Sequence, residues 1–217
     1  TPFLCVFVSN NMSFFSKFFG KGETPEPLDL KPTAELMAQD QYWRLVEDSI
    51  KNSVDQETQL SYLVASLRKL SPAEMVGFRL RTDKLLFDTY NSEMWCAGYL
   101  MNGGCSDDGF EYFRLWVISR GRDVYEMAKA DPDSLIAVAD VEVPEGLFDL
   151  ESFWYVALTA FENKTGKQLY DYIDYDNFNW GESNYPQIDF TWQEDDPESM
   201  MKICPRLFER FGINETA

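Results

Sequence analysis

The sequence predicts a mainly α-helical protein, a compact single domain of about seven helices, and three observations lead to this class. Apolar residues recur at spacings of three and four between positions 33 and 165, which is the pattern of one face of an α-helix. Glycines, prolines and capping residues separate these runs, as they do at helix ends. With 217 residues, of which 45% are apolar and 16% aromatic, the chain is long enough to bury the core of one ordinary domain.

The residues before this domain, 1–32, are predicted to be an N-terminal extension and a linker. The segment before Met12 is interpreted either as an artificial addition or as an upstream in-frame extension, with natural translation beginning at that methionine. Residues 13–19 put four phenylalanines on one helical face. This face suits either a small membrane- or partner-binding helix, or a terminal segment that docks on the core or stays disordered. Three prolines in ETPEPLDLKP (23–32) favour an extended linker.

The first two helices of the domain are predicted in AELMAQDQYWRLVEDSIKNS and DQETQLSYLVASLRKL. In both stretches the apolar side chains fall on one stripe of a helix. The stripes are Leu36, Trp43, Val46 and Ile50 in the first helix, and Leu60, Leu63, Val64, Leu67 and Leu70 in the second. Each helix therefore has one face for the core.

The third and fourth helices are predicted from their end signals. The third begins at SPAE, where Ser71 caps the helix, Pro72 fits the first helical position and Glu74 completes a capping box. It is expected to run to about Tyr90. The fourth lies in SEMWCAGYLMNGG and ends at one of its two final glycines, because glycine accepts the left-handed conformation of a C-terminal cap.

The stretch NGGCSDDGF (102–110) is predicted to be the corner between the fourth and fifth helices. Ser106, Asp107 or Asp108 caps the new helix, and Asp108 and Glu111 have the spacing of a capping box. The apolar stripe of the fifth helix is Phe110, Phe113, Trp116 and Val117.

After Gly121, a short sixth helix is predicted in DVYEMAKADPDSL, where Pro132 stops it, and a seventh in LESFWYVALTAFENKTG. The helical domain then spans residues 33–165. Residues 166–217 form an irregular acidic-aromatic segment packed on the same domain, mostly loop, in which a short β-hairpin also fits. PESMMKICPRLFERFG adds a last short helix, which Pro205 interrupts.

The middle of the chain carries MWCAGYLMNGGCSDDGFEYFRLWVISRG and DVYEMAKADPDSL, with YWRLVEDSI and LSPAEMVGF upstream and FWYVALTAFENKTGKQL downstream. With these stretches the chain resembles a mostly bacterial family of uncharacterised domains, some of which occur beside WGR domains. The resemblance covers most of residues 40–170 and implies a compact, mainly helical fold. It carries no established activity and therefore assigns no catalytic residue.

Charge and composition exclude several classes of function. The formal net charge of -18 argues against binding to nucleic acid or to an anionic membrane, and favours a basic protein partner. The chain has no histidine, so it lacks the usual general base at neutral pH and the commonest nitrogen ligand of metals. The four cysteines have no CxxC spacing and are interpreted as reduced thiols of a cytoplasmic protein, in preference to disulfides. No stretch is long enough to span a membrane, and we expect neither a metal nor a cofactor.

The corner from Cys105 to Arg122 is the candidate site for small-molecule chemistry. Cys105 or Ser106 at a helix start suits a nucleophile, but without histidine only a carboxylate, a lysine or a tyrosine is left as its base, so a structural thiol is favoured. Asp107 and Asp108, with Glu111, suit a divalent cation, although adjacent aspartates at a helix start are more often caps.

Three arginines, Arg114, Arg120 and Arg122, suit a phosphate or carboxylate ligand at the same corner. Pairing of these arginines with the nearby Asp107, Asp108 and Asp123 is the favoured alternative. A calcium loop in DYIDYDNFNWGE is excluded, because the position that needs glycine is Asn179.

The acidic-aromatic segment is the candidate partner-binding surface. Residues 140–199 contain 15 acidic residues against two lysines. This charge serves either solubility alone or, together with the aromatic rings of the same stretch, the recognition of a basic partner. The expected contact residues are Tyr175, Trp180, Glu182, Tyr185, Asp189, Trp192, Glu194, Asp195 and Asp196.

These observations favour a non-enzymatic, cytoplasmic protein-binding module, most concretely an immunity-type inhibitor that binds and neutralises a basic toxin or effector. One alternative is a small enzyme or anionic-ligand sensor at the corner. Its residues would be Cys105, Ser106, Asp107, Asp108, Arg114 and Arg120. The other alternative is a regulatory accessory domain without chemistry of its own.

Overall fold

The computed structural model describes residues 28–141 and 143–212, and it is mainly helical, as predicted. Helices account for 66% of it, and these two ranges contain no β-sheet. The backbone forms only isolated bridges there, of which one joins Thr33 and Ile173. The β-hairpin expected in the C-terminal segment is therefore wrong, because side chains rather than a paired strand hold this segment in place. The Phe-rich helix and most of the linker lie outside the described residues.

The seven predicted helices correspond to α2–α8, and the described residues contain further helices after them. The seven are α2 (Gln39–Lys51), α3 (Gln56–Leu67), α4 (Pro72–Asp88), α5 (Ser92–Asn102), α6 (Asp107–Ser119), α7 (Arg122–Ala130) and α8 (Val156–Thr165). Two more α-helices follow, α9 (Pro197–Ile203) and α10 (Pro205–Phe211). Short 3-10 helices lie between them at η2 (Pro132–Val138), η3 (Pro144–Gly146), η4 (Glu151–Tyr155), η5 (Leu169–Tyr172) and η6 (Glu182–Asn184). The total exceeds seven because of these 3-10 helices and because α9 and α10 form the last helix predicted in PESMMKICPRLFERFG, with the expected break at Pro205.

Local signals explain where the helices begin and end. The predicted capping box of α4 is confirmed: Ser71 Oγ accepts a hydrogen bond from Glu74 N, and the Glu74 carboxylate accepts one from Ser71 N. Helix α5 ends at Gly103, whose φ of 66° is left-handed and favours glycine. Gly121, with a φ of 95°, turns the chain between α6 and α7.

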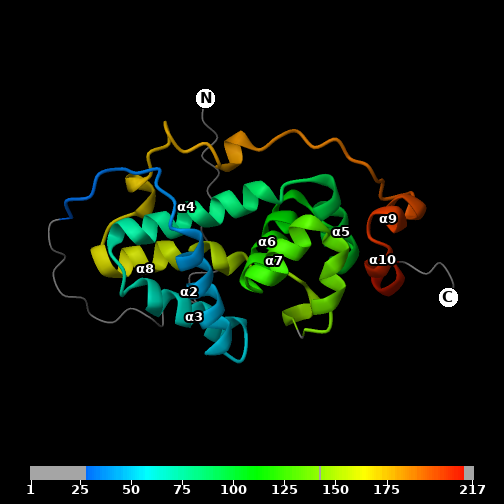
Figure 1. Ribbon diagram of the computed structural model, residues 1–217, viewed down its shortest axis with the longest axis horizontal. Helices are drawn as coiled ribbons and strands as arrows, with labels where there is room; N and C mark the ends of the chain where they lie inside the picture. The colour runs from blue at the N-terminus through cyan, green and yellow to red at the C-terminus, as the bar shows by residue number, and fades with distance from the viewer. Residues whose placement is uncertain (1–27, 142, 213–217) are drawn as a thin grey trace.

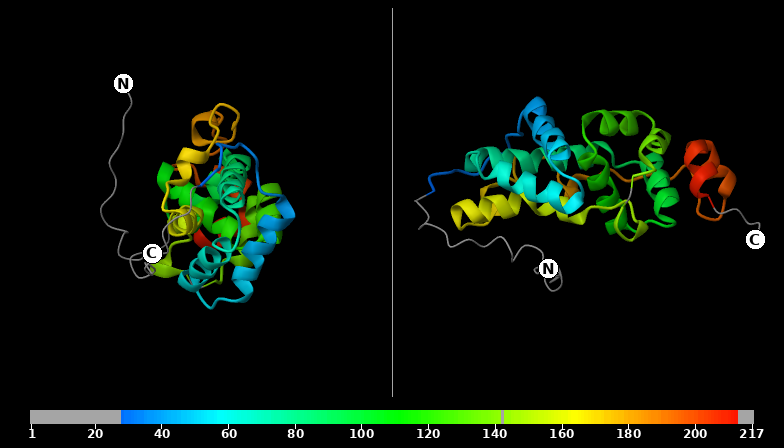
Figure 2. Two further views of the ribbon diagram at one scale, coloured as in Figure 1. Left: turned by 90° about the vertical axis from the view of Figure 1, so that its left-hand side faces the viewer. Right: turned by 90° about the horizontal axis from the view of Figure 1, so that it is seen from below.

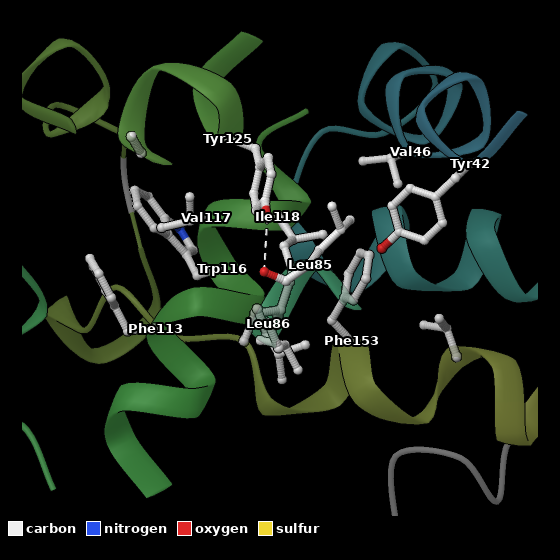
Figure 3. Close-up of a cluster of buried hydrophobic side chains, with 14 of the residues drawn as sticks. Tyr42, Val46, Leu85, Leu86, Phe113, Trp116, Val117, Ile118, Tyr125 and Phe153 are labelled. Atoms are coloured by element: carbon white, nitrogen blue, oxygen red, sulfur yellow. Dashed lines mark hydrogen bonds between the residues drawn. The ribbon is translucent and has the colours of Figure 1, made fainter. Parts of the chain in front are cut away.

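The core extends through all the described α-helices, and one cluster of it lies between α4, α6, α7, η4 and α2 (Figure 3). Leu85 and Leu86 of α4 meet the α6 stripe, of which Trp116 and Ile118 are fully buried. The hydroxyl group of Tyr125 donates a 2.9 Å hydrogen bond to the Leu85 carbonyl oxygen, so this buried polar group is satisfied. In the described part of the chain, no helix has the length and apolar content needed to cross a lipid bilayer.

After α8 the chain turns back along the helical body. We call residues 168–198 the acidic strap, because they contain nine carboxylates and no lysine or arginine. In Figure 1 the strap runs from the end of α8 along one side of the body to α9, and Figure 2 shows α9 and α10 at the opposite end of the molecule from that of α8.

Aromatic rings attach the first half of the strap to the end of α4. The Trp180 ring lies 5.0 Å from the Phe87 ring, edge to face. The Tyr185 ring stacks on the Tyr90 ring at a centroid distance of 4.3 Å. These contacts use the apolar faces of the strap, so its carboxylates are left on the outside.

The second half of the strap is attached to α5, and helix α10, which follows the strap, is attached to η2. Trp192 is buried, and its indole Nε1 donates a 2.8 Å hydrogen bond to the Ser92 carbonyl oxygen. Beyond the strap, the buried Asp133 of η2 accepts hydrogen bonds from Arg206 Nε at 2.7 Å and from the backbone N–H of Leu207 at 2.9 Å. The strap is therefore fixed at both ends.

Candidate functional site

The predicted corner between α5 and α6 is present, and its cap is Ser106. The Ser106 Oγ accepts a 3.2 Å hydrogen bond from Gly109 N, while Asp107 and Asp108 are the first two residues of α6 and are exposed. The capping box expected between Asp108 and Glu111 is not formed. Because Ser106 occupies the capping position, the third helical position is Gly109, and Glu111 lies two residues too far along the helix to complete a box.

The arginines near the corner face away from its aspartates. Arg114 is buried and donates from Nη1 to the Leu86 carbonyl oxygen and from Nε to the Phe110 carbonyl oxygen. Arg120 donates to Gln59, at 2.9 Å. The guanidinium groups of Arg114 and Arg120 therefore donate hydrogen bonds to carbonyl and amide oxygens of the helical body, and not to the aspartates of the corner.

Arg122, the third of these arginines, pairs with Asp40 of α2 at 2.9 Å. The expected pairing of the arginines with Asp107, Asp108 and Asp123 is therefore wrong. No open cluster of arginines at the corner is left to hold an anion, since two of the three guanidinium groups bind within the body and the third is paired.

The Cys105 side chain does not have the properties of a nucleophile. Burial raises the pKa of the Cys105 thiol to about 12, the nearby Arg114 opposes this shift, and Asp107 adds to it. The thiol is protonated at neutral pH, whereas a thiolate is the reactive form. Among the described residues, no three carboxylates or thiols come together as a metal site.

The residues predicted to contact a partner fall into two groups. Trp192 is only 5% exposed, and Trp180 and Tyr185 are half-buried with their rings against the body. The others are exposed, with Tyr175 at 63%. The exposed carboxylates of this prediction are Glu182, Asp189, Glu194, Asp195 and Asp196. Trp180, Tyr185 and Trp192 of the strap thus face the body, whereas Tyr175 and these carboxylates face solvent.

The carboxylates of the strap lack a paired basic residue within the described part of the chain. Every ion pair among the described residues is formed by carboxylates that lie outside the strap. The nearest basic residues in the sequence, Lys167 and Lys202, flank the strap. The nine carboxylates of the strap therefore form no ion pair with the residues that the structure describes.

A cavity of about 240 Å³ lies where the strap passes over α4 and η4. The body contributes Arg79, Asp83 and Trp154 to its lining, and the strap contributes residues between Tyr170 and Tyr185. Sequence reasoning missed this cavity, because its lining comes from three separate parts of the chain. One signal was present: Arg79 and Asp83 are charged residues one helical turn apart in a helix that is otherwise largely buried.

The charged residues of the cavity are fixed by one another. Arg79 Nε donates to Asp83 Oδ2 at 3.1 Å, and its Nη2 lies 3.0 Å from the other carboxylate oxygen. The Arg79 guanidinium carbon lies 3.6 Å from the centre of the Trp154 ring, which is a cation–π contact. Burial raises the pKa of Asp83, and Arg79 opposes this shift.

Glu111 of α6 lies close enough to this cavity for its charge to be affected by the lining residues. Burial raises the pKa of the Glu111 carboxyl group to about 7, Arg114 opposes the shift, and the negative charge of Glu182 adds to it. Among the described residues no hydrogen bond to the Glu111 carboxylate is formed. The group therefore titrates near neutral pH, whereas the sequence suggested a capping residue or a ligand of a divalent cation.

The fold and these features define the class: a mainly helical domain with a buried aromatic core and an acidic strap laid over a small cavity. The chain belongs to the family described as "Protein of unknown function (DUF4240)", which it matches over residues 37–163. This confirms the expected relation to a family of unknown function. Comparisons with curated proteins and with solved structures found no match. The family range contains α2–α7 and most of α8, and the acidic strap follows it.

Proposed function

We propose that this protein is a non-enzymatic binding module whose acidic strap receives a basic surface of another protein. In its most concrete form the proposal is a cytoplasmic, immunity-type inhibitor that neutralises a basic toxin or effector. We also propose that the family is mostly bacterial and that some of its members occur beside WGR domains.

The observation that carries the proposal is that three aromatic rings attach the strap to the body while its carboxylates face solvent. Its rings at Trp180, Tyr185 and Trp192 hold the backbone against the body. Its carboxylates, all exposed except the half-buried Asp174, form no ion pair with other described residues. A partner therefore meets charges that are already in place, and binding costs little ordering of the chain. A concentrated negative surface also speeds the approach of a positive one.

The proposed contact surface therefore omits Trp180 and Tyr185, whose rings pack against the body. Tyr175 and the exposed carboxylates from Glu182 to Asp196 form the proposed surface, while Trp192 supports it from inside. Phe190, which is 52% exposed, is added to it as an apolar contact. An exposed aromatic ring among charged groups is a typical anchor of a protein interface.

The test uses two variants of equal net charge. In the strap variant, Asp189→Asn, Glu194→Gln and Asp195→Asn are combined. The control variant neutralises three exposed carboxylates of the helical body, Glu35→Gln, Glu57→Gln and Asp123→Asn. A partner is first isolated from native lysate with the full chain and identified by mass spectrometry.

Association rates of the purified partner are then measured at about 50 and 500 mM salt. We expect the strap variant to associate at least about tenfold more slowly at low salt, and the control variant to change far less. Binding that is insensitive to salt, or that both variants weaken equally, contradicts the proposal. If the partner is toxic, co-expression of the wild-type chain should restore growth and the strap variant should not.

A further inference from the structure

We propose that the cavity beneath the strap is a receptor for one basic side chain, an arginine or a lysine, which the protein partner inserts against the exposed ring of Tyr175. The inference rests on the proposed function, because it names the part of a basic partner that the strap recognises. It extends that function from a charged surface to a defined site.

The size of the cavity suits a single side chain. Its volume is about 240 Å³, whereas sites for drug-sized ligands occupy ~300–1,000 Å³. Five of its twelve lining residues are aromatic, Trp154, Tyr170, Tyr175, Phe178 and Tyr185. Aromatic walls of this kind accept the apolar stem of arginine or lysine as well as its charged end.

Rings in this region already hold cations of the protein itself. The Arg79 guanidinium group lies over Trp154 at 3.6 Å, and the Lys84 ammonium group lies over Trp180 at 4.1 Å. Tyr175, by contrast, is 63% exposed, and no ring or cation among the described residues stacks on it. The ring face that an incoming cation needs is therefore free at Tyr175.

The charge of the lining selects a cation over an anion. The positive charge of Arg79 is balanced by Asp83 at 3.0 Å, and its Nη1 donates to the Trp154 carbonyl oxygen. The remaining charged lining residue is Glu182, which is exposed and unpaired among the described residues. An anion would meet the Glu182 carboxylate, while a lysine or arginine would pair with it.

Glu111, which lies outside the lining but close enough to interact with Glu182, Arg79 and Asp83, adds a second negative charge beside the cavity near neutral pH. The groups whose charges act on it are Arg114 on its own helix, Arg79 and Asp83 on α4, and Glu182 on η6. Its carboxyl group titrates at a pKa of about 7. A bound cation favours the ionised form, so binding releases a proton and the affinity rises between about pH 6 and 8.

The test measures the binding of small probes to the full chain by tryptophan fluorescence and NMR titration. The cationic probes are N-acetyl-arginine amide and N-acetyl-lysine amide, and N-acetyl-aspartate amide is the anionic control. Glu182→Gln removes the lining carboxylate, and Asp189→Asn is the matched control, an exposed carboxylate of the strap outside the cavity.

We expect a cationic probe to bind saturably, with a Kd of about 1 mM. Glu182→Gln should weaken binding about tenfold, and Asp189→Asn should leave it within about twofold. The wild-type affinity should rise from pH 6 to pH 8, and Glu111→Gln should remove most of this rise. Tyr175→Ala should weaken both cationic probes without changing the melting temperature.

Three results overturn the cavity proposal: no saturation by either cationic probe, tighter binding of the anionic probe, or equal effects of Glu182→Gln and Asp189→Asn. Spermidine is a further probe, and affinity for it more than about a hundredfold above that for the amino-acid probes assigns the cavity to a free polyamine instead. None of these results touches the salt-dependent association of the whole strap with a partner. That measurement alone decides the proposed function, so the two failures are distinguishable.

Discussion

At the scale of single residues, Glu111 connects pH to stability. Its carboxyl group has a pKa of about 7 in the folded protein, against a usual value of 4.5. The folded state therefore holds this proton more tightly than the unfolded state does. The resulting contribution to stability is complete below about pH 4.5 and is lost as the pH rises through 7.

Glu111→Gln should remove this dependence, because the amide is neutral at every pH. Relative to wild type, we expect the free energy of unfolding of the variant to increase between pH 4.5 and 8. The increase should be on the order of 1–3 kcal/mol, reduced from the full pKa shift because the group is partly exposed. Urea unfolding at several pH values measures it. Glu57→Gln, at an exposed site, is the control, and curves that run parallel for Glu111→Gln and wild type refute the assignment.

Ser106 is a second residue whose role is specific. Because its Oγ accepts the Gly109 N–H, Ser106→Ala should reduce the free energy of unfolding by about 0.5–2 kcal/mol. Asp107→Ala should cost only ~0.3–1 kcal/mol, since it removes a charge near the helix dipole but no cap. Chemical denaturation compares the two variants. A larger loss in Asp107→Ala than in Ser106→Ala would show that the aspartate is the true cap.

At the scale of elements, the strap depends on Trp192. The ring packs 5.2 Å from the Tyr99 ring, and its Nε1 donates to the Ser92 carbonyl oxygen. Trp192→Ala removes both contacts and should cost about 3–5 kcal/mol, either from global stability or from the attachment of the strap alone. Tyr175→Ala, at an exposed ring, should change stability by less than ~0.5 kcal/mol.

Hydrogen exchange and limited proteolysis separate the two possibilities for Trp192→Ala. If the strap alone detaches, the protection of backbone amides from hydrogen exchange should fall between residues 186 and 200. The amides of the helical body should remain as protected as in the wild type. Equal protease sensitivity of the Trp192 and Tyr175 variants would mean that the indole ring does not hold the strap.

The same elements show how far the sequence predicts the structure. Helices α2–α8 follow from apolar periodicity and end signals, such as the box of Ser71 and Glu74, because these act within a few residues. The position of the strap does not follow, since Trp192 bonds to Ser92, which lies 100 residues earlier. The cavity was missed for the same reason, and the arginines of the corner were misassigned because their partners lie on other helices.

At the scale of the whole molecule, the formal net charge of -18 opposes compaction. Repulsion among like charges is screened by salt. We expect the melting temperature to rise by a few degrees between about 20 and 500 mM sodium chloride, as calorimetry would show. The strap variant with three neutralised carboxylates should show a smaller rise than wild type. A melting temperature that falls with salt would mean that ion pairs, rather than repulsion, dominate the surface.

The attachment of the strap also has a consequence for synthesis on the ribosome. Phe87, Tyr90 and Trp95 receive rings of the strap, and these rings are translated roughly 90–100 residues later. At a translation rate of ~5–20 residues per second, the rings of the strap are synthesised on the order of 5–20 s after this aromatic surface. During that interval the nascent domain has an exposed apolar surface to which chaperones and neighbouring chains can bind. A fragment cut at the family boundary, residue 163, would keep that surface bare permanently and should aggregate where the full chain does not.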